Sequence, residues 1–368
     1  MAERVLTERE LNRAVLGRQG LLAQSSRAIA PTLRAIGGLQ AQYAPSMYVG
    51  LWSRMGGLER DALTRALQQR TIVQATLMRM TIHLVAKRDY WPFALAVREA
   101  RREMWIRAIR GAATAGQLAE FALRVREHLA AHGEISRKEL DALVGKAHAL
   151  GTGLWVDLVR VPPSGTWERR RADRFGLAQD WVGPPPPLTA DEAAAHLVRS
   201  YLAGFGPATR ADVASCTGLS HTALAHAYEH LRLRSFRSEH GDELLDVARG
   251  ALPDPDTPAP ARYLPTWDAT LLVHARRARI LPEEHRPKIF GVRIPQSRPT
   301  FLVDGAVAGA WKYVDGRIQR EPFERLDRAA QRALDDEAER LAAFHAQGAF
   351  TGVRCRASWA RSSAQLRP

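Results

Sequence analysis

The chain has 368 residues, enough for two or three domains of ordinary composition. Its 53 Lys and Arg residues against 39 Asp and Glu residues give a formal net charge of +14, which favours a polyanionic partner because neutralised phosphates release condensed counterions. Two cysteines exclude a disulfide framework and a four-thiolate zinc site, the charged N-terminal stretch predicts no signal peptide, and no apolar run is long enough to predict a membrane span.

Residues 1–115 predict a first unit in which helices precede strands. Thr7 and Glu10 form a capping-box pattern at the start of the first helix, and Ile72–Val85 is rich in β-branched residues typical of strands. Three helices followed by strands is the element order of a winged helix with additions. The expected helices span residues 7–20, 31–40, 58–70 and 89–110.

Residues 116–186 and 187–253 predict two further winged-helix units, because each reads as three helices followed by a wing. Pro184–Pro187 is a stiff linker between them. In the earlier unit the basic stretch Val161–Trp181 is the expected wing. The expected helices span residues 118–131, 136–144, 148–159, 191–202, 209–216 and 220–231, and the last hairpin has strands 233–236 and 244–247.

Residues 254–348 predict a β-rich region with hairpins and a closing helix, and residues 349–368 a basic tail. Asp304-Gly305 and Asp315-Gly316 are typical hairpin turns. We expect strands at 262–272, 301–303 and 307–313 and a helix at 326–344. The fold class is therefore α+β, with three tandem winged-helix units and a β-rich C-terminal region.

The residues most suggestive of chemistry are Gln40 and Gln42, in the tripeptide Gln40-Ala41-Gln42 at or just past the end of a predicted helix. Two amides two positions apart face the same way only in extended or turn geometry. Alone, this pattern more often marks a helix end than a site. No motif for a metal site, a phosphate-binding loop or a serine nucleophile accompanies it, so we expect no metal and no cofactor.

Several segments, spread over nearly the whole chain, resemble the winged-helix DNA glycosylases of the AlkZ and YcaQ type. They span residues 11–22, 38–45, 48–52, 80–85, 263–272 and 301–311. The family's catalytic motif is Gln–apolar–Gln in the AlkZ branch and Gln–apolar–Asp in the YcaQ branch. Gln40 and Gln42 match the AlkZ branch.

The resemblance implies a DNA glycosylase that removes N7-alkylated purines, including bulky adducts or interstrand crosslinks, in self-resistance to a DNA-alkylating natural product. The implied partner is double-stranded DNA, with no membrane. We expect a C-shaped monomer with a basic DNA channel, in the cytoplasm and associated with the nucleoid. Which adduct is the substrate, and whether the base is flipped, the sequence leaves open.

Glutamine chemistry agrees with this substrate class. An amide does not titrate, so it is no ordinary general base, but it can hold a water and stabilise positive charge developing on the sugar. That suffices when the leaving base is already cationic. No lysine accompanies Gln40 and Gln42, so a monofunctional hydrolase is favoured over a Schiff-base lyase.

The candidate DNA contacts are Arg169, Arg170 and Arg171 in the predicted wing, with Arg276 and Arg277 at a strand edge. His83 lies among apolar neighbours, and is either a hydrogen-bonded structural histidine or a phosphate or substrate contact. The alternative function is a non-catalytic winged-helix transcription regulator. An RNA-binding or scaffolding role has only the charge in its favour.

Overall fold

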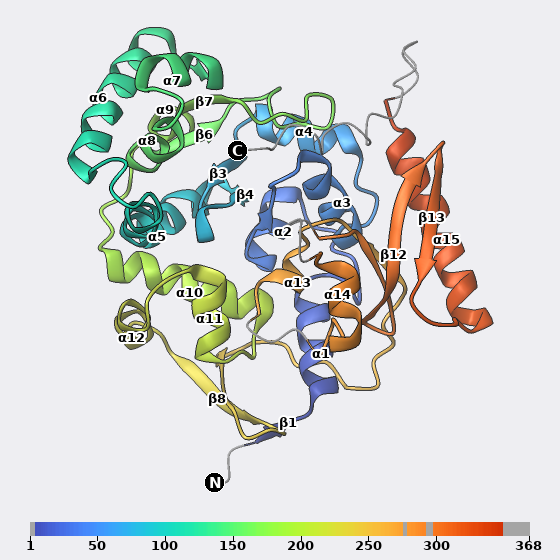
Figure 1. Cartoon of the computed structure of the whole chain (residues 1–368). Coiled ribbons are helices and arrows are strands. Elements are labelled where there is room, and N and C mark those ends of the chain that lie inside the picture. Colours follow the sequence, from blue (N-terminus) through green and yellow to red (C-terminus); the bar gives the residue numbers. More distant parts are fainter. Residues whose placement is uncertain (1–3, 275–277, 292–296, 349–368) are drawn as a thin grey trace.

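The computed structural model describes residues 4–274, 278–291 and 297–348 (Figure 1). Helices and strands alternate along most of the chain, which confirms the prediction of a mixed α and β protein. Arg276, Arg277 and the expected tail 349–368 lie outside the described residues. Among those described, no helix is both long enough and apolar enough to cross a membrane.

The N-terminal part has the expected helices and strands, with one helix that the sequence analysis missed. The predicted helix 31–40 is wrong at its end, since it stops at Ile36, where Gly37 (φ 79°) and Gly38 (φ 82°) turn the chain into a short strand. The elements are β1 (Val5–Leu6), α1 (Glu8–Arg18), α2 (Ile29–Ile36), β2 (Leu39–Gln40), α3 (Ala44–Arg54), α4 (Arg60–Gln68), β3 (Ile72–Thr76), η1 (Met78–Met80), β4 (Ile82–Ala86) and α5 (Lys87–Ala108). The missed helix is α3.

The next part continues the same sheet. Its strands join β2, β3 and β4 in one antiparallel sheet of order β2-β4-β3-β6-β7-β5, in which Ala75 of β3 pairs with Val159 of β6. The sheet therefore crosses the predicted boundary at residue 115. The predicted helix 148–159 is wrong over its last residues, which form a strand. The elements are α6 (Ala115–His132), β5 (Ile135–Ser136), α7 (Arg137–Val144), α8 (Ala149–Trp155), β6 (Leu158–Arg160), β7 (Arg174–Leu177) and α9 (Ala178–Val182).

Residues 190–247 form three helices followed by a hairpin, as expected. Thr189, Thr209 and Ser220 cap the helices with their side chains. The elements are α10 (Ala190–Phe205), α11 (Arg210–Thr217), α12 (His221–Glu229), β8 (Leu233–Ser238) and β9 (Glu243–Val247). Strand β1 adds to the hairpin, pairing in parallel with β8, so the N-terminus of the described chain is tied to this part (Figure 1).

The C-terminal part is a four-stranded antiparallel sheet covered by a long helix. The expected turns at Asp304-Gly305 and Asp315-Gly316 are confirmed, and all four residues have positive φ, as a type I′ turn requires. The predicted strand 262–272 is wrong over its second half, because Asp268 caps a helix there. The elements are β10 (Arg262–Leu264), α13 (Ala269–Leu272), η2 (Glu283–His285), α14 (Arg286–Ile289), β11 (Thr300–Val303), β12 (Ala306–Val314), β13 (Arg317–Pro322) and α15 (Arg328–Ala346).

A fully buried ion pair joins the first and last parts. Arg54, at the end of α3, donates two hydrogen bonds of 2.8 and 2.9 Å to Asp268, and both side chains are 0% exposed. Burial alone raises the pKa of Asp268, but the charge and hydrogen bonds of Arg54 outweigh it and lower the pKa. The pair fixes α3, which begins just after Gln42, against α13.

Candidate active site

Gln40 and Gln42 lie at one edge of the six-stranded sheet, on and just past β2. Gln40 pairs with His83 of β4, and the Ala41 N–H donates to the Ile82 carbonyl at 2.7 Å. Ala41 is 3% exposed and packs in a core that includes Leu39. This explains the apolar residue between the two amides, and the extended backbone turns both glutamines to the opposite face from Ala41.

The two amides differ in exposure, but in both the carbonyl oxygen accepts a hydrogen bond from the protein. Gln40 is 8% exposed and its Oε1 accepts a hydrogen bond from Arg79 Nη2 at 3.1 Å. Gln42 is exposed and its Oε1 accepts from the Ile82 N–H at 3.1 Å. Because both donors are N–H groups, each amide is fixed with its carbonyl oxygen toward the protein. A carbonyl oxygen has two lone pairs, so Gln42 can still accept from a water and donate through its NH₂.

Arg79 was not found by the sequence analysis. Its guanidinium bridges the Gln40 carbonyl oxygen and the Cys216 carbonyl oxygen of α11. Arg79 and the following Met80 have φ of 53° and 58°, the left-handed region that residues with a Cβ rarely adopt. Such strain persists only where the surroundings impose it, and it often marks a functional segment. The only signal in the sequence is an arginine between two predicted strands.

His83 is buried beside Gln40 and is not a cation. It is 4% exposed, and its Nδ1 donates to the Thr81 carbonyl at 3.0 Å. Burial, with the nearby charge of Arg79, lowers the pKa of His83 to about 3. The imidazole is therefore neutral at pH 7 and offers phosphate no positive charge.

The arginines of the expected wing lie in the loop between β6 and β7, and all three are exposed. Arg169 and Arg171 both face Asp173, at 3.8 and 3.4 Å. Arg170 instead donates to the Tyr43 hydroxyl at 3.1 Å, and Tyr43 directly follows Gln42. The structure thus brings Arg170 to the motif.

Two further arginines that the sequence analysis missed, Arg101 on α5 and Arg160 on β6, contact the end of β3. Thr76 pairs with Ile82 and accepts hydrogen bonds from Arg101, through its carbonyl, and from Arg160, through its hydroxyl at 2.9 Å. Burial lowers the pKa of Arg160 to about 10, so it is charged at neutral pH. Arg79, Arg101 and Arg160 thus place three cations where β3 leads into β4, the strand that pairs with β2.

Comparison with known proteins places the chain in a family. The AlkZ-like DNA glycosylase family matches residues 33–344, which include Gln40, Gln42 and the loop of Arg169–Arg171. The chain belongs to this family. The family assignment confirms the predicted resemblance to these DNA glycosylases.

Two similar proteins come from Streptomyces sahachiroi. A curated protein named interstrand DNA cross-link repair glycosylase is 30% identical over an alignment of 184 positions that covers 46% of this chain and 46% of that protein. The chain thus spans about half the length of this curated relative. The solved structure of the DNA glycosylase AlkZ superposes with a TM-score of 0.78 over 93% of this AlkZ-like chain and 97% of that one, at 20% identity, which establishes a shared fold.

Proposed function

We propose that this AlkZ-like protein is a monofunctional DNA glycosylase that hydrolyses the N-glycosidic bond of N7-alkylated, cationic purines in double-stranded DNA. The observation that carries the proposal is the pair Gln40 and Gln42, whose carbonyl oxygens are fixed by N–H donors and whose side chains form no hydrogen bond with a carboxylate or a lysine among the described residues. A site without an acid cannot protonate a neutral leaving base. A site without an amine forms no Schiff base.

The chemistry then depends on the substrate's own charge. The bond between C1′ and N9 breaks, the bonding electrons go to the purine, and the cationic N7-alkylated base leaves as a neutral molecule. The deoxyribose becomes oxocarbenium-like, and a fixed dipole on that side is most effective where the charge develops. Water held by Gln42 adds to C1′ and releases its proton to solvent. Gln40 is largely buried, so its proposed role is to hold the edge of the sheet at β2 in the orientation that presents Gln42.

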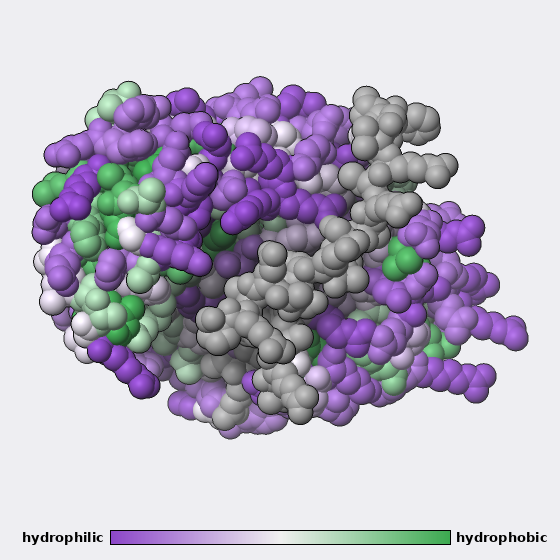
Figure 2. Space-filling model, turned by 45° about the horizontal axis from the view of Figure 1, so that its top comes forward, coloured by the Kyte–Doolittle hydropathy of each residue, from purple (hydrophilic) through white to green (hydrophobic). Residues whose placement is uncertain are grey.

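Positive charge around the motif supports DNA as the partner. Arg170 is exposed beside Tyr43, and Arg79 lies next to Gln40. Most of the face shown in Figure 2 is hydrophilic, as suits a surface that contacts a sugar-phosphate backbone. We propose Arg169, Arg170 and Arg171 as DNA contacts and His83 as a neutral support for Gln40.

The architecture fits the same role. Residues 190–247 have the helix order and hairpin of a winged helix, and the shared sheet joins the two earlier units that we propose. Three such units in one chain suit a C-shaped monomer that surrounds duplex DNA in a basic channel. We propose that its biological substrates include bulky adducts or interstrand crosslinks. We also propose that it serves in self-resistance to a DNA-alkylating natural product.

The test compares leaving groups. Duplexes with a single N7-methylguanine, a uracil or an undamaged guanine are incubated with the protein and treated with alkali, which breaks the strand at an abasic site. We expect breaks only at N7-methylguanine, and none with the double variant Gln40→Ala, Gln42→Ala. The variant Gln68→Ala, an exposed glutamine on α4, is the matched control. Tight binding to one undamaged sequence without breaks would instead indicate a transcription regulator.

A further inference from the structure

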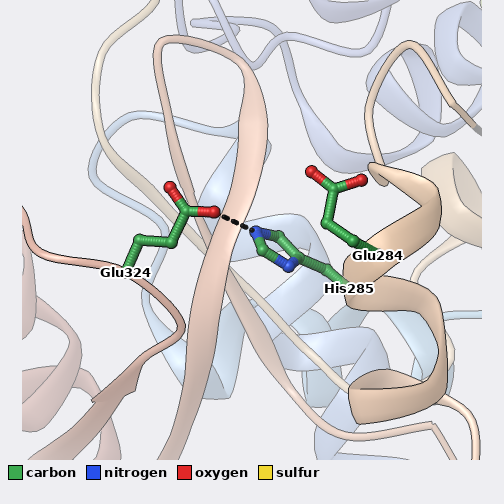
Figure 3. Close-up of side chains that lie close together, drawn as sticks. All are labelled: Glu284, His285 and Glu324. Atoms are coloured by element: carbon green, nitrogen blue, oxygen red, sulfur yellow. Dashed lines mark ion pairs between the residues drawn. The ribbon is translucent and has the colours of Figure 1, made fainter.

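A cluster far from the motif in sequence brings one histidine and two carboxylates together. Glu284 and His285 lie on η2, and Glu324 lies just after β13. One imidazole nitrogen of His285 and one carboxylate oxygen of each glutamate all lie within 4.8 Å of one another. Figure 3 shows the His285 ring between the two carboxylates, with Glu324 coming from a separate segment.

The histidine of this cluster is buried and lacks hydrogen bonds. His285 is 5% exposed, and no described residue accepts from or donates to its Nδ1. Its Nε2 lies 3.6 Å from Glu324 Oε1, beyond the range of a hydrogen bond. Neither ring nitrogen thus has a hydrogen-bond partner among the described residues, and Nε2, the nitrogen that faces Glu324, is available to a ligand. The ring itself is held in place by an edge contact with Phe323, with centroids 5.1 Å apart.

We propose that Glu284, His285 and Glu324 bind a divalent transition-metal cation, with Zn²⁺ as the preferred ion. One imidazole nitrogen and two carboxylate oxygens suit Zn²⁺ better than Mg²⁺ or Ca²⁺, which take oxygen ligands. In a tetrahedral zinc site, ligands at about 2.1 Å from the metal lie about 3.4 Å from one another. Both glutamates are exposed and can rotate inward to reach that spacing.

The bound metal would have a structural role. It would join the turn of η2 and α14 to the end of β13, two segments that lie on either side of β11 and β12 in the chain. Because Nδ1 of His285 lacks the carbonyl or carboxylate partner that metal-binding histidines usually have, we expect micromolar affinity rather than that of a four-ligand structural site.

The test uses the full chain, without an affinity tag and stripped of metal with a chelator. ZnCl₂ is titrated by calorimetry, and CoCl₂ by the visible absorption of tetrahedral Co²⁺. We expect one ion per chain, with affinity roughly tenfold weaker or more in Glu284→Gln and in Glu324→Gln. The matched control is Glu283→Gln, an exposed neighbour on the same turn that faces Arg286 at 3.6 Å and should bind as the wild type does.

Thermal unfolding of the same proteins gives a second readout. At the same Zn²⁺ concentration, Zn²⁺ should raise the Tm of the wild type and of Glu283→Gln by a similar amount, and that of Glu324→Gln by less. Absence of saturable binding in the wild type, or equal affinity in all three variants, would mean that the three side chains lie together without binding a metal. No DNA is involved, so the outcome is independent of the proposed glycosylase activity.

Discussion

Two regions of the molecule differ in what stabilises their helices and strands. One is the segment from α2 to β4, and the other is the part formed by α10, α11, α12, β8 and β9. In the later part, side chains such as Thr189 and Thr209 cap the helices from within the local sequence. In the earlier segment, α2 and α3 begin without a side-chain cap, and Arg79 and Met80 are left-handed. The candidate catalytic residues therefore lie where distant contacts, and not local ones, impose the backbone.

The largest effect is expected from Arg54→Ala, which removes the distant tether of α3. The change leaves Asp268 as an unpaired, fully buried carboxylate. Breaking a buried pair in this way costs about 3–5 kcal/mol. Urea unfolding monitored by circular dichroism measures this loss in the free energy of unfolding. A loss below about 1 kcal/mol would show that α3 does not depend on this contact.

The same pair predicts how stability depends on pH. The folded-state pKa of Asp268 is lowered, so its contribution is fully present above the unfolded value of about 3.9 and is lost as pH falls toward the folded value. Tm should therefore drop between pH 5 and pH 3. In Asp268→Asn, which is less stable at neutral pH, this part of the drop should disappear. An unchanged slope would assign the acid sensitivity to other carboxylates.

Gln42→Ala should affect activity and not stability, the reverse of Arg54→Ala. Loss of a group that orients a reacting water or stabilises charge lowers the rate roughly 10²- to 10³-fold. Because Gln42 is exposed, the free energy of unfolding should change by about 0.5 kcal/mol or less. Single-turnover cleavage of N7-methylguanine DNA measures the rate. Gln42→Asp, which can still accept from the Ile82 N–H, should retain more activity than Gln42→Ala.

Arg79→Gly separates strain from function. Glycine adopts the left-handed backbone freely, so the relief of about 1 kcal/mol offsets part of the lost hydrogen bonding, and stability should stay close to that of the wild type. Activity should fall roughly tenfold, because the Gln40 carbonyl loses its donor. Arg70→Gly is a matched control, since Arg70 also has positive φ (58°) but contacts Trp181 and Asp180 instead. Equal base-excision rates for the two variants would mean that Arg79 has no role in the active site.

The same contrast explains which features the sequence could predict. Caps at Thr7 and Thr209 and turns such as Asp304-Gly305 act within a few residues, so their elements were found. The pairing of β3 with β6 and the bridge from Arg79 to Cys216 join residues far apart in the chain, and no local pattern encodes them. Gln40 and Gln42 stand out in the sequence as a polar pair, but their proposed catalytic role rests on resemblance to a family.

The smallest effect is expected in the locally determined part. Thr209 caps α11 and forms a reciprocal pair with Asp212, so Thr209→Ala should cost about 1 kcal/mol of stability. Although α11 supplies the Cys216 carbonyl to Arg79, loss of a cap frays only the first turn, and that carbonyl lies near the other end of the helix. Glycosylase rates should therefore equal those of the wild type, measured at a temperature where both are folded. A slower variant would mean that local order in α11 is transmitted through Arg79 to Gln40, and that the two regions are less independent than their capping patterns indicate.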